Sequence, residues 1–355
     1  MIHSLTPTLN KETGNAHFSY TKIQDKYATQ NTQSYVVNYL VNNKSYSVEV
    51  HIIDVNLSKL IKQRGKDVLS TIMSASMMCQ KFTVIVVGAL FTNIVNTAPI
   101  VALENYLTNT MFKELNCTPN LLLLRDYVPK TKFESGNKYR YILNDVVMTF
   151  EVNSAWLSIQ DYCSALSKKY KSRTLKTLDA AKELTIVEFS LNDIKAYQEQ
   201  IINLFNQVVS KQSLSIIMHN DDYFYHLKNY LGSNFKFYGF IDTDNQLVAF
   251  MPIIMHDATY CEVHYIGYDA KYNNIYKLYQ NILLQAVKFG IENKMERINL
   301  GHTSLEAKAI LGAKATVLSH AYKTKGLIAK HMINQIVNYI DAAYNDEWKE
   351  RNPFK

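Results

Sequence analysis

The chain has 355 residues, of which 47% are apolar and 19% charged, so it is long enough for two folded domains and too apolar for a disordered protein. Its net charge of +7 suits an anionic partner such as a phosphorylated cofactor, a carrier protein or RNA. The cysteines, Cys79, Cys117, Cys163 and Cys261, lie far apart without metal-binding spacing, which predicts reduced thiols, no metal site and a cytoplasmic protein.

The start of the chain lacks the charged-then-apolar pattern of a signal peptide. The most apolar stretch, 82–103, is interrupted by several polar residues, Gly88 and Pro99. A bilayer span needs about 20 mostly apolar residues. We therefore expect no membrane span.

The first half shows an α/β pattern. Alternating residues predict strands over 34–42 and 45–55, and helical spacing predicts a helix over 57–80. Two apolar runs, 82–88 and 120–125, predict buried strands on either side of a helix over 102–116, and a further alternating run covers 140–153.

The second half predicts a helix, a three-stranded meander and then alternating helices and strands. The expected elements are a strand over 184–190, a helix over 191–209 capped by Asn192, a hairpin of 235–242 and 247–254 with a bulge or edge at Pro252, a strand over 260–268, a polar loop over 269–274, a helix over 275–293, a strand over 297–301, a helix opened by a capping box at 303–306, a strand over 316–323 and a terminal helix over 328–344. We place the domain boundary so that residues 1–153 and 154–355 form two domains.

Three blocks of the second half carry a family resemblance. They are 156–173, then 264–269 leading into 278–283, and 299–308 followed by 311–313. These blocks resemble predicted N-acyltransferases of the GNAT superfamily related to the Fem-type peptidyl transferases, which contain two such domains in tandem. The resemblance implies an α/β fold with mixed sheets, a degenerate N-terminal GNAT-like domain and a catalytic C-terminal one.

The resemblance also implies a reaction. The expected enzyme transfers an acyl group from a thioester, acyl-CoA or acyl-carrier protein, to a primary amine of an amino acid, amino sugar or lipid precursor. The alternatives are a Fem-type transferase that uses aminoacyl-tRNA, which is the less favoured donor, and a catalytically silent binding subunit. No permanently bound cofactor and no DNA partner are expected.

The donor-binding residues are expected on two segments. Where acetyltransferases carry a glycine-rich pyrophosphate loop, this chain has 269–276 without a glycine, so that Lys271, Asn273 and Asn274 become candidates. In the lysine-rich segment, Lys169 and Arg173 share one helical face with Lys176 and suit phosphates, although a solvated helix face explains the same pattern.

The catalytic candidates lie on the expected strand 260–268. Alternation places Glu262 and His264 on one face, where either could take a proton from the amine, and Tyr265 on the other. The alternative is a solvent-facing pair. GNAT enzymes often use a tyrosine to protonate the leaving thiolate, but 304–312 contains none, which leaves Tyr322 as a substitute.

Three further residues of the third block are expected to bind substrate. His302 precedes the helix, Lys308 suits an anionic group, and Glu306 is either a substrate contact or the return partner of the capping box.

Overall fold

The computed structural model describes residues 5–7, 31–41, 44–56, 81–90, 100–127, 139–209, 221–326, 330, 333 and 349–355. The predicted helix over 57–80, nearly all of the one over 328–344, and Cys79 lie outside these residues. Within the described ranges, no helix combines the length and apolarity needed to cross a membrane.

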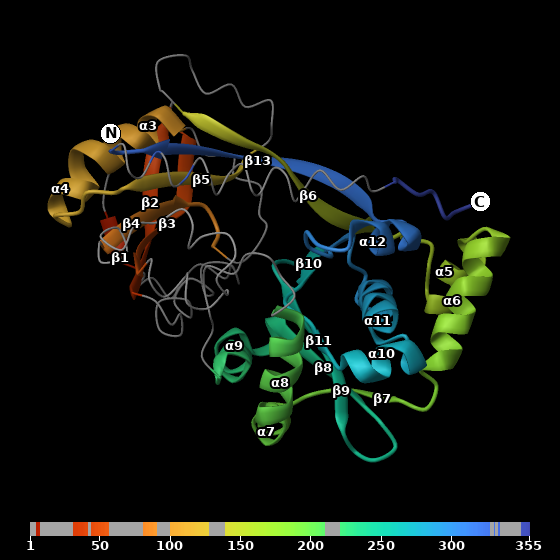
Figure 1. Cartoon of the computed structure of the whole chain (residues 1–355). Helices are drawn as coiled ribbons and strands as arrows, with labels where there is room; N and C mark the ends of the chain where they lie inside the picture. Colours follow the sequence, from red (N-terminus) through yellow and green to blue (C-terminus); the bar gives the residue numbers. More distant parts are fainter. Residues whose placement is uncertain are drawn as a thin grey trace.

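The described residues of the N-terminal part form strands and a helical region at 100–114 (Figure 1). Its elements are β1 (Leu5–Pro7), β2 (Asn31–Val41), β3 (Lys44–Asn56), β4 (Lys81–Val87), α3 (Ile100–Tyr106), the π-helical turn η1 (Leu107–Met111), α4 (Phe112–Glu114), β5 (Leu121–Tyr127) and β6 (Arg140–Glu151). The parallel pairing of β4 with β5 confirms the predicted α/β unit.

The C-terminal part alternates helices with the remaining strands. Its elements are α5 (Ile159–Ala165), α6 (Lys168–Ala180), β7 (Thr185–Glu188), α7 (Leu191–Ala196), α8 (Gln198–Val209), α9 (Tyr223–Leu231), the 3-10 turn η2 (Gly232–Asn234), β8 (Phe235–Ile241), β9 (Leu247–Met255), β10 (Tyr260–Val263), β11 (Gly267–Tyr268), α10 (Ala270–Tyr276), α11 (Leu278–Glu292), β12 (Arg297–Asn299), α12 (Leu305–Leu311) and β13 (Lys314–Thr324). The order of helix, meander, helix, strand, helix and strand is the one predicted.

The strands form one continuous mixed sheet in the order β1-β2-β3-β4-β5-β13-β6-β12-β10-β9-β8-β7, with β11 beside β9. Pairing is parallel for β4 with β5 and for β10 with β12, and the other ladders are antiparallel. The long strand β13 lies between β5 and β6, so a strand from the end of the chain joins two strands of the N-terminal part (Figure 1).

Both faces of the sheet are covered around β9. Met251 and Ile253 belong to the core beneath α5, α6, α11 and α12, which we call the α11 face. Phe250 and Ile254 belong to the core beneath α7, α8 and α9, which we call the α9 face. A strand buried on both sides reads as a continuous apolar run, which is the pattern of 247–254.

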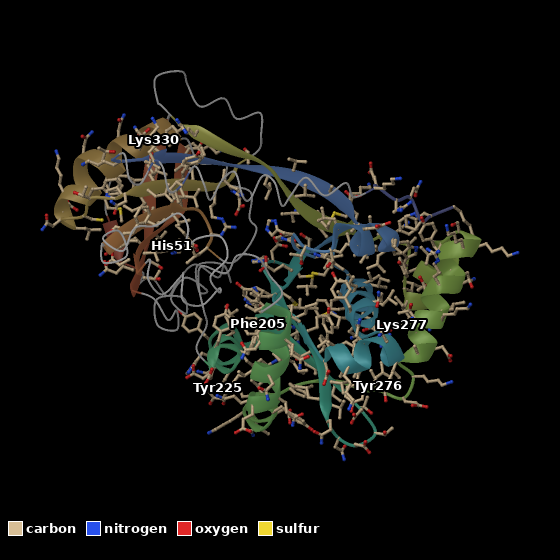
Figure 2. The ribbon with its side chains drawn as sticks, in the orientation of Figure 1. His51, Phe205, Tyr225, Tyr276, Lys277 and Lys330 are labelled. Carbon is tan, nitrogen blue, oxygen red and sulfur yellow. The ribbon has the colours of Figure 1, made fainter. Side chains whose placement is uncertain are left out.

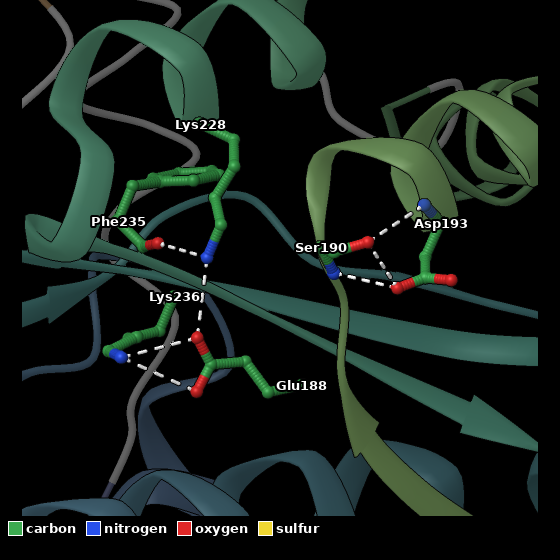
Figure 3. A network of polar contacts seen from close by, with 6 residues as sticks. All are labelled: Glu188, Ser190, Asp193, Lys228, Phe235 and Lys236. Atoms are coloured by element: carbon green, nitrogen blue, oxygen red, sulfur yellow. Dashed lines mark hydrogen bonds and ion pairs between the residues drawn. The ribbon is translucent and has the colours of Figure 1, made fainter.

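The helix predicted over 191–209 is two helices, α7 and α8, and its cap is not Asn192. Ser190 Oγ accepts the N–H of Asp193, and the Asp193 carboxylate accepts the N–H of Ser190 at 2.8 Å (Figure 3). This reciprocal pair satisfies two N–H groups at the helix start, whereas Asn192 already lies inside the first turn.

The polar loop predicted over 269–274 is helical and forms α10. The following helix begins at Leu278 rather than 275, because Lys277 adopts φ 48 and ψ 46 and separates α10 from α11. Tyr276 and Lys277 mark this junction in Figure 2. A left-handed residue cannot continue an α-helix, so one predicted helix becomes two.

The third strand of the meander and the next helix also differ from prediction. The strand is broken into β10 and β11, with Tyr265 at φ 50 between them. At the start of α12 the predicted capping box is wrong, because Ser304 adopts φ 55 and its side chain makes no cap hydrogen bond. Pro252 lies within an unbroken β9, and the irregularity of this hairpin falls at 240–241 instead.

Candidate functional site

The parallel strands β10 and β12 pair over three residues and then separate. Glu262 and Asn299 form the last pair of the ladder. Beyond it, the N–H of His264 donates to β9 at 2.9 Å, while the N–H of Leu300 donates to β6 at 2.8 Å. The β10–β12 pairing therefore ends at Glu262 and Asn299, and beyond it each segment is hydrogen-bonded to its outer neighbour.

A buried chain of polar side chains lies at this separation, on the α9 face. Glu262 Oε1 lies 3.4 Å from His264 Nδ1, and its Oε2 lies 3.2 Å from His256 Nε2. The hydroxyl of Tyr223, from α9, lies 2.8 Å from His264 Nε2. Glu262 and His264 are each 3% exposed, so they do not form a solvent-facing pair.

The surroundings set the charges of this chain. Burial alone would raise the pKa of Glu262, but the charge and hydrogen bonds of His256 and His264 lower it to about 2. Burial lowers the pKa of His264 below 6.5, although Glu262 opposes the shift. A carboxylate beside a neutral imidazole is thus favoured near pH 7. The tautomer that satisfies both neighbours donates from Nδ1 to Glu262 and accepts the Tyr223 hydroxyl at Nε2.

Tyr265 connects this chain to the N-terminal part of the protein. The prediction that Tyr265 lies on the face opposite to His264 is wrong, because the left-handed turn at this residue packs its ring against the α9-face core. The centre of the Tyr265 ring lies 4.5 Å from that of His264 and 5.6 Å from that of Phe205 of α8, which is labelled in Figure 2. Burial raises the pKa of Tyr265, and the charge of Arg125 on β5 opposes that rise. The Arg125 guanidinium donates to the carbonyls of residues 89 and 90, which fixes this cation near the site.

Lys308 lies on the α11 face, opposite to Glu262 and Tyr223. The side chain is 3% exposed, and a Cβ added to Gly301 would lie 3.9 Å from its Nζ. No described residue forms a hydrogen bond or ion pair with Nζ, and burial lowers the pKa of Lys308 to about 7. A buried amine therefore stands beside the point where β12 leaves β10.

Two of the predicted substrate residues lie near Lys308 in sequence but differ in surroundings. His302 directly follows Gly301 and is half-buried. Glu306 is exposed and pairs with Arg351 from the C-terminal segment, an interaction that replaces the predicted capping box.

Tyr322 lies apart from the other catalytic candidates. It is buried in β13 and pairs with Arg140 of β6. Asn299, the last paired residue of β12, and Lys314 of β13 both pair with Thr149 on β6. Lys314 therefore lies at the same height along the strands as the point where β10 and β12 separate. Tyr322 follows Lys314 by eight residues, which is about 26 Å along a strand.

The donor candidates of α10 have different surroundings. Lys271 and Asn274 are exposed, and the Lys271 ammonium lies 4.9 Å from the centre of the Tyr272 ring. Asn273 Oδ1 accepts the N–H of Tyr279 at 3.0 Å, in the first turn of α11. The N–H groups at the start of a helix are the ones an anion would use, and Asn273 already occupies one of them.

The basic residues of α6 form an exposed face, as predicted. Lys169, Arg173 and Lys176 point away from the core, whereas Thr174 and Thr177 are buried. The end of α6 is joined to α11 by the Asn281 side chain, which donates to the Thr177 carbonyl at 2.8 Å. The structure thus packs the buried face of α6 against α11, with the basic face turned outward.

A surface hollow of about 500 Å³ lies elsewhere, lined among others by Glu188, Ser190, Lys228 and Lys236. Its cations are already compensated, since Lys228 and Lys236 both pair with Glu188, at 3.3 and 3.2 Å (Figure 3). We therefore place the candidate site at the strand separation.

Sequence patterns missed three residues of this site: Tyr223, His256 and Arg125. Tyr223 is 41 positions from its partner His264, and no local spacing connects them. His256 could have been found, because it directly follows the second hairpin strand and lies two residues beyond Ile254, which pairs with Glu262 on the next strand. Arg125 follows the apolar run 121–124, and a single cation at the end of such a run is common in strands of any function, so it did not indicate a site.

No protein-family model matches the chain, and no curated protein matches it in sequence. Solved structures do resemble it. A conserved protein of unknown function from Bacteroides thetaiotaomicron VPI-5482 has a TM-score of 0.53 at 11% identity, covering 92% of this chain and 100% of that one. The L-PGS of Bacillus licheniformis has a TM-score of 0.50 at 11% identity, covering 95% and 96%.

A tandem GNAT protein from the clavulanic acid biosynthesis pathway is a more distant match, with a TM-score of 0.46 at 8% identity over 87% of this chain and 88% of that one. Together with the observed order of elements, the similarities to the Bacteroides protein and to L-PGS confirm the predicted mixed α/β fold. They concern the fold alone. The relation to Fem-type transferases stays a prediction.

Proposed function

We propose that the protein is an N-acyltransferase whose reaction takes place where β10 and β12 separate. The observation that carries the proposal is the buried chain of Glu262, His264 and Tyr223 at the end of the β10–β12 ladder. Burying linked titratable groups costs free energy that a purely structural strand end does not need to spend, and such groups are concentrated at active sites.

The buried side chains Glu262, His264 and Tyr223 provide a route for the proton that an attacking amine must lose. In the proposed step the acceptor amine gives its proton to the Tyr223 oxygen while the phenol proton passes to His264 Nε2. The Glu262 carboxylate stabilises the imidazolium that forms, and His256 holds the other carboxylate oxygen. Main-chain N–H groups at the separation would polarise the acyl carbonyl.

We assign the acyl donor to the α11 face and the amine to the α9 face. A thioester donor, acyl-CoA or acyl-carrier protein, would place its phosphates near the exposed cations Lys169, Arg173 and Lys271. Asn274 is exposed beside them. Because Asn273 occupies an N–H of α11, the diphosphate would be held by these side chains rather than by the helix start.

In this proposal residues 154–355 form the catalytic domain, with Tyr265 and His302 lining the reacting groups, and residues 1–153 contribute Arg125 to the site. The acceptor is a small-molecule or lipid amine, and the protein works in the cytoplasm. Aminoacyl-tRNA as donor remains the second candidate, since a basic α6 face suits tRNA equally well.

The test has two steps on the full chain. Thermal shifts with coenzyme A, compared with ADP and sulfate at fixed salt, report whether a thioester cofactor binds; a ligand at 100 times its Kd adds about 2.7 kcal/mol. Thiol release from acetyl-, succinyl- and palmitoyl-coenzyme A is then followed with pooled amino acids and amino sugars. Release that needs an amine and is lost in Glu262→Gln supports the proposal. The absence of both coenzyme A binding and thiol release would refute the version of the proposal with a coenzyme A donor.

A further inference from the structure

Lys308 is the titratable group of the site that the proton route on the α9 face does not use. It projects from α12, whose residues Ala309 and Leu311 belong to the core of the α11 face. Glu262 lies on the other face of the sheet, in register with Ile254 of the α9-face core. The base chain and Lys308 therefore approach the strand separation from opposite sides.

Lys308 is unusual because its amine is buried with no described partner. Nearly every buried ammonium in a protein has a carboxylate or several acceptors to compensate the lost hydration. Here desolvation is the one cause that shifts its pKa, to about 7, so the side chain exchanges a proton readily near neutral pH.

The rest of α12 offers no competitor for an acid role. Its other titratable residue, Glu306, is exposed and pairs with Arg351. Lys308 Nζ lies against Gly301, where the missing side chain leaves room beside the diverging strand. A group bound between the strands from the α11 face would meet this amine.

We propose that Lys308 is the general acid that protonates the leaving sulfur of the acyl donor, an inference that rests on the proposed acyl transfer. The amine nitrogen forms the C–N bond on the carbonyl carbon, and the amine proton passes to Tyr223 and His264. When the C–S bond breaks, its electron pair goes to sulfur, which takes a proton from the Lys308 ammonium and leaves as a thiol. Lys308 is left neutral and recovers a proton from water, while the imidazolium releases one, so the cycle closes without another reactant.

This assignment differs from an anion-binding lysine, the role that the sequence suggested. An anion clamp needs a positive charge at all times, and arginine would serve it. A general acid must give its proton away, which arginine does not do. The two roles therefore predict opposite behaviour for Lys308→Arg.

The test compares donors whose leaving thiols differ in acidity. Acetyl-coenzyme A and 4-nitrothiophenyl acetate serve as donors, with hydroxylamine as the acceptor probe and the uncatalysed reaction subtracted. Lys308→Met and Lys308→Arg should lose about 10²-fold in kcat/KM on acetyl-coenzyme A and little on the nitrothiophenyl ester, whose thiolate leaves unaided. Lys314→Met, which replaces an exposed lysine at the start of β13, is the matched control and should keep both activities.

Equal losses on both donors would overturn the acid role, because a distorted site slows every donor alike. Retained activity in Lys308→Arg would also overturn it and favour an anion clamp. If the variants do not fold, wild-type rates across a series of acetyl thioesters decide: a shallow dependence on leaving-thiol acidity supports an acid, and a steep one refutes it. A wild-type protein that transfers from neither donor would refute the acyl-transfer proposal itself, and the acid role with it.

Discussion

The Tyr223 hydroxyl lies 2.8 Å from His264 Nε2, so the basic nitrogen of the buried imidazole faces a phenol from helix α9. His264 itself lies in the break between β10 and β11. Any amine that uses this histidine as a base must therefore reach it through Tyr223 or displace the phenol. Of the three linked side chains Glu262, His264 and Tyr223, Tyr223 is therefore the one that an acceptor amine meets first.

Replacing Tyr223 by phenylalanine tests that relationship. Tyr223→Phe removes one buried hydrogen bond, which costs about 1 kcal/mol, so the protein should stay folded. We expect kcat/KM for acyl transfer to fall about 10²-fold, since the proton route is interrupted. Tyr230→Phe alters the same helix at a 44% exposed position and should leave the rate unchanged. Equal rates for both variants would remove Tyr223 from the mechanism.

Lys308 also makes a prediction about stability that needs no substrate. Its pKa is 10.5 when unfolded and about 7 when folded, so between these values the unfolded chain binds more protons and stability rises with pH. The difference between these two pKa values corresponds to about 5 kcal/mol of stability, which is fully recovered above pH 10.5 and lost as the pH falls to 7.

Lys308→Met should accordingly be more stable than wild type at pH 7, with an advantage that shrinks as the pH rises to 10.5. Urea unfolding of both proteins across this range measures the difference. Lys314→Met, which replaces an exposed ammonium paired with Glu151, should show no comparable trend. A constant difference between wild type and Lys308→Met would mean that the lysine is solvated or paired in solution.

The sequence predicted those features that depend on neighbours along the chain. Alternation predicted the β8–β9 hairpin, and continuous apolar runs predicted β4 and β5, because burial of a strand on one or both faces is visible in the local pattern. The cap at Ser190 could also have been read, since an aspartate follows it three residues later.

The remaining features depend on tertiary contacts. The left-handed residues Tyr265 and Lys277 break elements that the pattern made continuous, and left-handed Ser304 moves the start of α12. None of the three is a glycine or asparagine, the residues that usually indicate such a turn. Within the candidate site, Glu262 and His264 follow from alternation on one strand. Their burial and the contact with Tyr223 do not, because a distant helix supplies them.

The basic face of α6 predicts a salt-dependent affinity for the donor. The triple variant Lys169→Gln, Arg173→Gln, Lys176→Gln should weaken coenzyme A binding roughly tenfold, about 1.4 kcal/mol, and flatten its dependence on ionic strength, because fewer cations meet the phosphates. Isothermal titration at two salt concentrations measures both effects.

A triple variant of equal charge change controls for the loss of net charge. It replaces lysines away from α6 by glutamine, namely Lys195, Lys288 and Lys294. If the control weakens binding as much as the α6 variant does, the attraction comes from the overall charge and the α6 face is a solvated surface.

Gly312, at the end of α12, makes the last prediction, which concerns how the C-terminus is held. It adopts φ +104, and a Cβ there would lie 2.4 Å from the Phe354 ring. That ring packs against Trp156 at 5.8 Å and Tyr162 at 6.3 Å, so it cannot move without disturbing the core. Gly312→Ala should therefore lower the free energy of unfolding by about 2 kcal/mol more than Gly326→Ala, whose φ of +91 is similar but whose surroundings are open. Chemical denaturation measures both, and the excess should vanish when Gly312→Ala is combined with Phe354→Ala. An excess that persists in the double variant would show that a contact other than the Phe354 ring, such as that with Pro353, requires glycine at this position.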